Sequence, residues 1–394
     1  MIAGVPLETH PGERRVALVP MVLPMLAKAG IEVVLQAGAG IAAGFPDSEY
    51  EARGARLVAD RAQVLSSADV VLLVHGPDAA PSANELDGLR ADKVLIALLN
   101  PLGAPQVARA LAAKRVTAFA LELLPRISRA QAMDVLSSMA SLAGYKAVLL
   151  AAATLDKIYP LMMTAAGTIT PSRTLVVGAG VAGLKAIATS RRLGSVVAAY
   201  DVRPAVKEQV ESLGAKFLEI QLETVSAEGA GGYARAMGED FYRRQRELMA
   251  GAVADSDVVI TTAAVPGEKA PVLVTEDAVR GMRRGAVIVD LAAETGGNCA
   301  LTRAGETVQV AGVTIIGPVN LAASLPYHAS QMYARNMTAF LQNLIKDGRV
   351  KLDGDDEIVR DSLLTHGGEV VNPRVRKLLG LPDAAATPAS ARSA

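Results

Sequence analysis

The segment VVGAGVAG constrains the fold of this chain more than any other stretch. Gly178, Gly180 and Gly183 directly follow an apolar run and open a stretch with helical spacing, which is the strand–turn–helix context of a dinucleotide-binding fingerprint. The first glycine permits a tight turn, the second lets the backbone approach a pyrophosphate, and the third lets the helix pack closely on the strand. The N-terminus of that helix, with Val181 and Ala182, is then expected to face the phosphates.

The next apolar run, SVVAAYD, ends in an acid where such domains hold the adenosine ribose. The carboxylate of Asp201 is placed to accept hydrogen bonds from the ribose hydroxyls and to repel a 2′-phosphate, which favours NAD over NADP. Val202 is expected beside the same ribose. Arg203 leaves NADP open, because an arginine nearby can accommodate the phosphate. A Pro-Gly turn at Ala263 to Gly267 suggests a second wall of the pocket, although most such turns are only turns.

Short β-branched runs alternate with helical stretches along all 394 residues. We expect strands at IEVVLQ, VVLLV, KVLIALL and RVTAFAL in the first half, and at TLVVGAG, SVVAAYD, KFLEI, DVVITTA and AVIVDLA in the second. This alternation predicts an α/β protein with two Rossmann-like, doubly wound parallel-sheet domains, separated by a cleft and joined by long helices. One joining helix is expected from Ser137 to about Pro160.

A second long helix, HASQMYARNMTAFLQNLIKDG, is expected to return from the second domain and to pack on the first. The expected domains are therefore residues 1–137 with 328–380, an NAD(H)-binding Rossmann domain at 138–327, and a disordered Ala/Pro/Ser tail at 381–394.

Charge and cysteine content exclude several classes of function. Lysine plus arginine and aspartate plus glutamate number 40 each, and no basic run carries interleaved aromatics, so nucleic acid is not expected as a partner. The single cysteine, Cys299, excludes an internal disulfide and a cysteine-rich metal site, and we expect it to be a small buried residue. No metal site is expected, and one cysteine fits a reducing compartment.

We expect a cytoplasmic protein without a membrane span of its own. The N-terminal residues lack the basic start, long apolar centre and small-residue cleavage site of a secretory signal. An uncharged stretch from Thr307 to Ala334 is interrupted by glycine and proline, which does not suit a spanning helix.

The segment RISRAQAMD, from Arg126 to Asp134, places several polar groups at fixed spacing between two structured regions. Such a segment can be a binding loop or merely a solvated one. Together with GVPLETHPGERRVALVP, AGGYARAMGEDF and SLPYHASQMYARN, it resembles the alanine dehydrogenase and nicotinamide nucleotide transhydrogenase family. The resemblance runs from about Gly4 to about Lys346. Within the family, the RxSRAQxMD pattern is similar to that of the soluble NAD(H)-binding component of proton-translocating transhydrogenases.

This resemblance implies a set of site residues. Four would be catalytic by positioning the nicotinamide and its ribose: Arg126, Gln131, Asp134 and Ser137. Others in the same segment would also contact the cofactor: Ile127, Ser128, Ala132 and Met133. Gly232 and Tyr233 would belong to a mobile loop, Leu222 to Gly238, that closes over NAD and excludes water. An ordinary flexible connection is the alternative there. Gln245 and Ala264 would also lie at the cofactor.

The function implied is direct transfer of hydride from NADH to NADP⁺. This transfer requires no side-chain proton donor, so the protein must supply distance, orientation and dryness. Because the chain has one GxGxxG, NADP(H) and the proton channel would belong to partner subunits: an NADP(H)-binding component and membrane-embedded subunits. The resemblance implies a homodimer, peripheral to the inner membrane through these partners and active only with them.

Two alternatives remain open. An alanine or related amino-acid dehydrogenase needs an acid/base residue and a cation for the substrate carboxylate, and the family's alanine dehydrogenases use a lysine and a histidine. Here His75 stands in the lysine's place, IALLNPLG has no histidine, and Arg15 alone is retained. His75 could serve as an acid/base or could be structural. A noncatalytic NAD-sensing module would need Gly178 to Gly183 and Asp201 but not the RxSRAQxMD segment.

Overall fold

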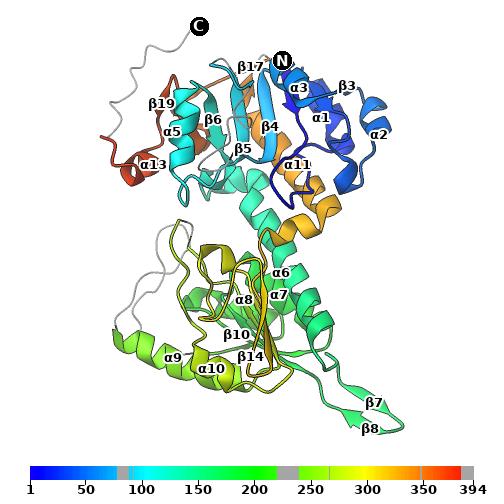
Figure 1. The fold of residues 1–394 in the computed structure, drawn as a ribbon, viewed down its shortest axis with the longest axis vertical. Coiled ribbons are helices and arrows are strands. Elements are labelled where there is room, and N and C mark those ends of the chain that lie inside the picture. Colours follow the sequence, from blue (N-terminus) through cyan, green and yellow to red (C-terminus); the bar gives the residue numbers. More distant parts are fainter. Residues whose placement is uncertain (78–87, 92, 220–238, 266, 347, 383–394) are drawn as a thin grey trace. The chain divides into compact units, whose positions relative to one another are not determined.

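The computed structural model describes residues 1–77, 88–91, 93–219, 239–265, 267–346 and 348–382, without the side chains of 239–243. These residues form two compact units (Figure 1). Unit 1 comprises Met1–Ser138 and Ala323–Ala394, and unit 2 comprises Met139–Ala322. The chain passes from unit 1 into unit 2 within one helix, α6 (Val135–Thr154).

Unit 1 is built on an eight-stranded sheet in the order β19-β18-β6-β5-β4-β1-β2-β3. Its strands are β1 (Ile2–Val5), β2 (Glu32–Gln36), β3 (Arg56–Val58), β4 (Val70–His75), β5 (Val94–Leu98), β6 (Thr117–Ala120), β18 (Leu363–His366) and β19 (Glu369–Val370). Strands β1 to β6 are parallel, whereas β18 pairs antiparallel with β6 and with β19. The run VVLLV forms central β4 because both of its faces are buried.

Helices pack around this sheet: α1 (Leu23–Lys28), α2 (Asp47–Glu51), α3 (Arg61–Ser67), α5 (Gln106–Ala113), α11 (Pro326–Leu344), α12 (Glu357–Ser362) and α13 (Pro373–Leu378). In α5 the buried residues Val107, Ala108, Leu111 and Ala112 recur with helical spacing, so one face joins the core. Single 3-10 turns include η3 (Leu121–Leu123) and η4 (Ser128–Met133). Two short strands, β16 (Ile345–Lys346) and β17 (Arg349–Val350), pair after α11.

Unit 2 is built on a seven-stranded sheet in the order β11-β10-β9-β12-β13-β15-β14. Its strands are β9 (Arg173–Val177), β10 (Val196–Tyr200), β11 (Lys216–Phe217), β12 (Val258–Thr261), β13 (Val287–Asp290), β14 (Thr307–Val310) and β15 (Val313–Ile316). Its further helices are α7 (Val181–Arg192), α8 (Lys207–Ser212), α9 (Glu239–Ala254) and α10 (Glu276–Arg280). The strand order reverses between β9 and β12, and doubly wound sheets bind ligands outside the carboxyl ends of their strands at such a point.

The predicted fold class is confirmed, since both sheets consist mainly of parallel strands connected by helices. The antiparallel strands at one edge of each sheet were not predicted. In unit 1, β18 follows β6 by more than 200 residues of sequence, and no local pattern announces such a pairing.

The predicted helix from Ser137 to about Pro160 is wrong at its end. Helix α6 stops at Thr154, because Leu155 and Tyr159 leave the helical path to pack in the core of unit 2. A hairpin of β7 (Met162–Thr164) and β8 (Gly167–Ile169) follows. Figure 1 shows this hairpin extending away from the rest of unit 2.

Helix α6 is also long and apolar enough to cross a membrane, by length and composition alone, among the residues that the structure describes. A core helix of a soluble protein meets the same criteria. Ala147, Val148 and Ala151 of α6 are buried in the core of unit 2, together with residues of β9 and α7. One third of the apolar window is buried in the structure.

Candidate functional site

The fingerprint of unit 2 adopts the geometry that its glycines predict. Gly178 follows β9 with a φ of 95°, which is open to glycine and unfavourable for other residues. A Cβ at Gly183 would lie 1.8 Å from the carbonyl oxygen of Gly178, so the third glycine permits α7 to touch the turn. A Cβ at Gly180 would meet nothing within 4 Å. The backbone at Gly180 is therefore approachable at the N-terminus of α7, which suits a pyrophosphate.

Val181 is exposed in the first turn of α7, whereas Ala182 faces α6. A Cβ at Gly144 of α6 would lie only 2.1 Å from the carbonyl oxygen of Ala182. The helix that carries the fingerprint is thus fixed on one side by close contact with α6.

Asp201 lies at the end of β10, beside the glycine turn, and its carboxylate is fully engaged within the protein. Its Oδ2 accepts from the Ala179 N–H at 2.7 Å and from the Arg203 guanidinium at 2.8 Å. Its Oδ1 accepts from the backbone N–H and from Nε of Arg203, both at 2.9 Å. Four donors match the roughly four acceptor positions of a carboxylate. A ribose diol at Asp201 must therefore displace or share the Arg203 side chain.

A second wall follows β12 at the strand reversal. The Thr262 N–H donates to the Val177 carbonyl at 2.7 Å, and Thr262 Oγ1 donates to the Gly178 carbonyl at 3.0 Å. Both backbone groups of Ala263 are bound by the side chain of Asn298. The neighbouring Ala264 is exposed. The wall that the Pro-Gly turn suggested is thus joined to the fingerprint itself.

Two further predicted contacts differ in what the structure says of them. Gln245 is 3% exposed, and its Nε2 donates to the Tyr200 hydroxyl at 2.9 Å. Burial raises the pKa of Tyr200 to about 12, so this hydroxyl stays protonated. Gln245 therefore braces β10 from the protein side. Gly232, Tyr233 and the predicted loop Leu222 to Gly238 lie outside the described residues.

In unit 1, the segment RISRAQAMD forms η4 and caps α6. Ala130 and Met133 are buried, whereas Arg126, Ser128, Gln131 and Ala132 are exposed, so the segment presents its polar residues to one side. Ile127 is half-buried. Asp134 accepts from the Ser137 N–H at 2.9 Å and from Ser137 Oγ at 2.5 Å. The structure therefore joins two of the predicted catalytic residues, and Met133 packs into unit 1 instead of facing outward.

Residues far away in the sequence hold this segment in place. Asn336 of α11 donates from Nδ2 to the Ala132 carbonyl at 2.8 Å. Arg129 forms a two-point ion pair with Asp356, the N-cap of α12, at 2.6 and 3.0 Å. The Arg129 guanidinium holds the pKa of Asp356 well below its usual range. Sequence reasoning missed Asn336 and Asp356, because both lie more than 200 residues after the segment.

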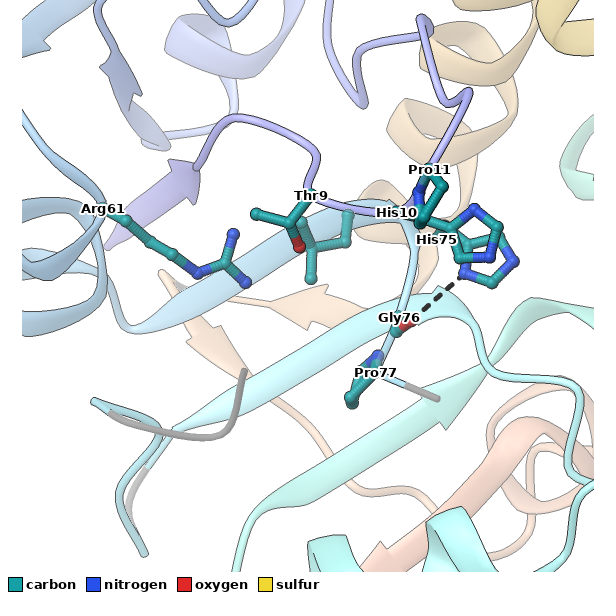
Figure 2. Close-up of a pocket in the computed structure, with 8 residues that line it drawn as sticks. Thr9, His10, Pro11, Arg61, His75, Gly76 and Pro77 are labelled. Atoms are coloured by element: carbon teal, nitrogen blue, oxygen red, sulfur yellow. Dashed lines mark hydrogen bonds between the residues drawn. The ribbon is translucent and has the colours of Figure 1, made fainter. Parts of the chain in front are cut away.

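Unit 1 also contains a small pocket at the carboxyl ends of β1 and β4, lined by Thr9, His10, Pro11, Arg61, Leu73, His75, Gly76 and Pro77 (Figure 2). The imidazole rings of His10 and His75 are stacked with their centroids 3.8 Å apart. Glu8 accepts from the N–H groups of Val74 and His75 at 2.7 and 3.1 Å, and burial raises its pKa to about 8.

Arg15, next to this region, is buried and already paired. Its Nε and Nη2 bind the two carboxylate oxygens of Glu13 at 2.7 and 2.6 Å. No group of three or more His, Cys, Asp or Glu side chains that could hold a metal ion occurs among the described residues. Cys299 is buried, as predicted, and burial raises the pKa of its thiol.

Comparison with known proteins decides the family. Models described as the N-terminal and C-terminal domains of alanine dehydrogenase/PNT match residues 4–143 and 147–373. The chain belongs to the alanine dehydrogenase/PNT family. An NAD(P) transhydrogenase subunit alpha chain from Rhodospirillum rubrum is 45% identical over 377 residues, which are 95% of this chain and 98% of the relative.

Solved structures agree with this membership of the alanine dehydrogenase/PNT family. The crystal structure of transhydrogenase from Sinorhizobium meliloti has a TM-score of 0.85 and 45% identity, covering 94% of this chain and 100% of that one. An L-alanine dehydrogenase has a TM-score of 0.79 and 26% identity, covering 96% and 99%. The resemblance predicted from the motifs is confirmed, and the chain is a nucleotide-binding oxidoreductase-family protein of the NAD and transhydrogenase type.

Proposed function

We propose that this chain is the NAD(H)-binding subunit of a proton-translocating transhydrogenase, and that it passes hydride directly between NADH and NADP⁺ held on a partner subunit. The intact fingerprint supports NAD(H) binding, because open space at Gly180 meets the N-terminus of α7. Relatives named as transhydrogenase alpha subunits, 45 and 42% identical to this chain, support the assignment to a multisubunit enzyme.

The pairing of Arg15 with Glu13 favours this function over amino-acid dehydrogenation. A dehydrogenase of that kind needs a cation available for the substrate carboxylate. In unit 1 the guanidinium of Arg15 is bound at two points by a buried carboxylate of its own chain. Opening this pair inside the protein would leave a buried charge without compensation, which is strongly unfavourable.

The residues proposed to act on the nicotinamide would do so by positioning. Bound NADH supplies the hydride from C4 of its nicotinamide, and no side chain needs to exchange a proton in that step. Gln131 is exposed, with an amide that can hold the carboxamide of the ring. Asp134 and Ser137 restrain one another, so their polar groups have a fixed direction. Asn336 and Asp356 hold the segment that carries them.

The hairpin β7–β8 supports a homodimer. Leu161, Met162, Met163 and Ile169 are 56, 41, 80 and 46% exposed, and an isolated hairpin of two short strands is only marginally stable in water. Helix α6, which precedes it, is apolar on all sides although one third of its apolar window is buried. Helices that are apolar all round are normally buried. We propose that a second copy of the chain covers the hairpin and α6.

The dimer is tested by sedimentation of the full chain. Met163→Asp should shift the protein towards monomer, because a charge would enter an apolar interface. Met25→Asp, at a methionine of α1 that is 48% exposed, is the matched control and should leave the mass unchanged. A monomeric wild type, or a dimer in Met163→Asp, would remove the hairpin from the interface.

The activity is tested by two assays on the purified chain. One follows hydride transfer from NADH to an NADP analogue after addition of a transhydrogenase NADP(H)-binding component, and the other follows NADH oxidation with pyruvate and ammonium. We expect activity in the first assay alone. Activity in the second assay without any partner would establish an amino-acid dehydrogenase, and NADH binding with neither activity would indicate an NAD-sensing module.

A further inference from the structure

The side chain of Asn298 binds both backbone groups of one residue in the wall after β12. Its Oδ1 accepts from the Ala263 N–H at 2.9 Å, and its Nδ2 donates to the Ala263 carbonyl at 2.7 Å. The same Nδ2 donates to the Pro271 carbonyl at 2.8 Å. One amide thus does for Ala263 what a neighbouring strand would do. The orientation of the peptide groups on either side of Ala263 is fixed in consequence.

Asn298 is itself held by a buried carboxylate. Both Asn298 and Asp290 are 0% exposed. Asp290, the last residue of β13, accepts five hydrogen bonds, from Thr261 Oγ1, the Ala292 N–H, the Asn298 N–H, the Cys299 N–H and Thr302 Oγ1. These donors satisfy the carboxylate completely, which is the condition for burying such a group. The amide of Asn298 is therefore presented to Ala263 from a rigid base.

Ala263 lies where a dinucleotide would cross the sheet. It follows β12, which is the strand next to β9 at the reversal of strand order. Thr262, directly before it, is bonded to the carbonyls of Val177 and Gly178. The exposed Ala264 comes directly after it. In this class of sheet the pyrophosphate binds at the turn after β9, so the half of the dinucleotide beyond β12 is the nicotinamide half.

We propose that Asn298 is a positioning residue for the nicotinamide, acting through the peptide groups of Ala263 to fix the wall that Ala264 presents. This inference rests on the proposed NAD(H)-binding function. The role requires an acceptor and two donors at one length. Aspartate keeps the length and the acceptor but loses both donors, serine is too short, and glutamine is longer by one methylene. Asn298 does not touch the reacting atoms.

The test compares Asn298→Ala with Asn372→Ala in the full chain. Asn372 is also a buried asparagine, 2% exposed, but it caps α13 in unit 1, where its Oδ1 accepts from the N–H groups of Arg374 and Val375. Both variants should lower the thermal midpoint. With the NADP(H)-binding component added, Asn298→Ala should lower kcat by about 10- to 100-fold. The Kd for NADH should change much less, because the fingerprint remains.

Stereospecificity gives a readout that lost stability cannot move. Wild type and Asn372→Ala should transfer hydrogen from a single face of NADH deuterated at the 4R or 4S position. Asn298→Ala should transfer from both faces, because the loosened wall lets the ring turn over. Asn298→Asp, which keeps the shape, should show the same mixed transfer. Single-face transfer with wild-type kcat in the Asn298 variants would overturn the proposal.

Hydrogen exchange on the wild type covers the case in which no Asn298 variant folds. The Ala263 amide should be among the slowest in unit 2 with or without NADH, and fast exchange there would overturn the proposal. The proposed function is judged separately, by whether wild type passes hydride to the partner's NADP⁺. If wild type instead oxidises NADH with pyruvate and ammonium, the ratio of variant to wild type and the stereospecificity are measured in that reaction.

Discussion

At the scale of single residues, Gly180 and Gly183 separate binding from folding. A Cβ at Gly180 meets open space and its φ of −75° suits any residue, so Gly180→Ala should leave the free energy of unfolding unchanged. It should weaken NADH binding by at least about tenfold, because the methyl group would stand between the backbone and the pyrophosphate. Fluorescence titration measures the Kd. Wild-type affinity in Gly180→Ala would mean that the cofactor does not approach this backbone.

Gly183→Ala is the matched variant of the same fingerprint. Its methyl group would lie 1.8 Å from a backbone oxygen, so α7 must move off the turn. Overpacking of this kind typically costs about 1–3 kcal/mol. Urea unfolding should therefore show a clear loss of stability in Gly183→Ala together with weak NADH binding, in contrast to Gly180→Ala.

Glu122 is expected to make unit 1 less stable as pH rises. Its Oε1 accepts from the N–H groups of Leu99 and Asn100, and burial raises the pKa of the carboxyl to about 7. Because the folded state holds a proton that the unfolded state releases above about pH 4.5, the contribution of Glu122 to stability is full below that pH. It is lost as pH rises through about 7.

Glu122→Gln keeps the accepting oxygen and removes the titration. The free energy of unfolding should therefore fall less between pH 5 and pH 8 in Glu122→Gln than in wild type, as measured by urea denaturation at both pH values. Some of the slope should persist, because Glu8 has its pKa raised to about 8 by burial. An identical slope in wild type and variant would show that Glu122 does not titrate in this range.

At the scale of elements, the contact between α6 and α7 depends on Gly144. Alanine in place of glycine inside a helix normally stabilises by about 0.5–1 kcal/mol. At Gly144 the new methyl group would lie 2.1 Å from the Ala182 carbonyl oxygen, so Gly144→Ala should destabilise unit 2 instead. Gly251→Ala in α9, where nothing lies within 4 Å, is the control and should stabilise. Calorimetry that gives both variants the same sign would refute the close crossing.

The elements also show where sequence reasoning succeeds. Gly178 to Gly183 and Asp201 lie within one βαβ unit, so spacing alone predicts their arrangement. Asn298 reaches Ala263 across 35 residues, and Arg129 reaches Asp356 across 227. No local pattern encodes such contacts. The hairpin β7–β8 was missed for a different reason, because packing of Leu155 and Tyr159 ends a helix that local propensity would continue.

The same limit applies to side-chain partners. The position of Asp201 was predictable, but its complete engagement by Arg203 and the Ala179 N–H was not. Arg15 was predicted as a retained substrate-binding cation, and only the structure reveals its pairing with Glu13. In both cases sequence predicts which residue is present, whereas the folded chain determines whether its charge is available.

At the scale of the whole molecule, the proposed function requires one nucleotide to affect both units. The fingerprint belongs to unit 2, whereas Gln131 and Asp134 belong to unit 1. Saturating NADH should slow amide exchange at the start of α7 and also in η4, because a ligand that binds the folded state lowers the population of locally opened forms. Peptides from β2 and β3 should be unaffected and serve as the internal control.

The pattern of exchange distinguishes the functions. Protection in α7 alone would fit an NAD-sensing module, whose binding needs only the fingerprint and Asp201, and would count against a role for RISRAQAMD. Asp201→Ala should abolish protection in both places, since Asp201 also orders the glycine turn through the Ala179 N–H. Gln131→Asn should keep the protection of α7 and weaken that of η4, because it shortens a side chain assigned to the nicotinamide and leaves the pyrophosphate site intact.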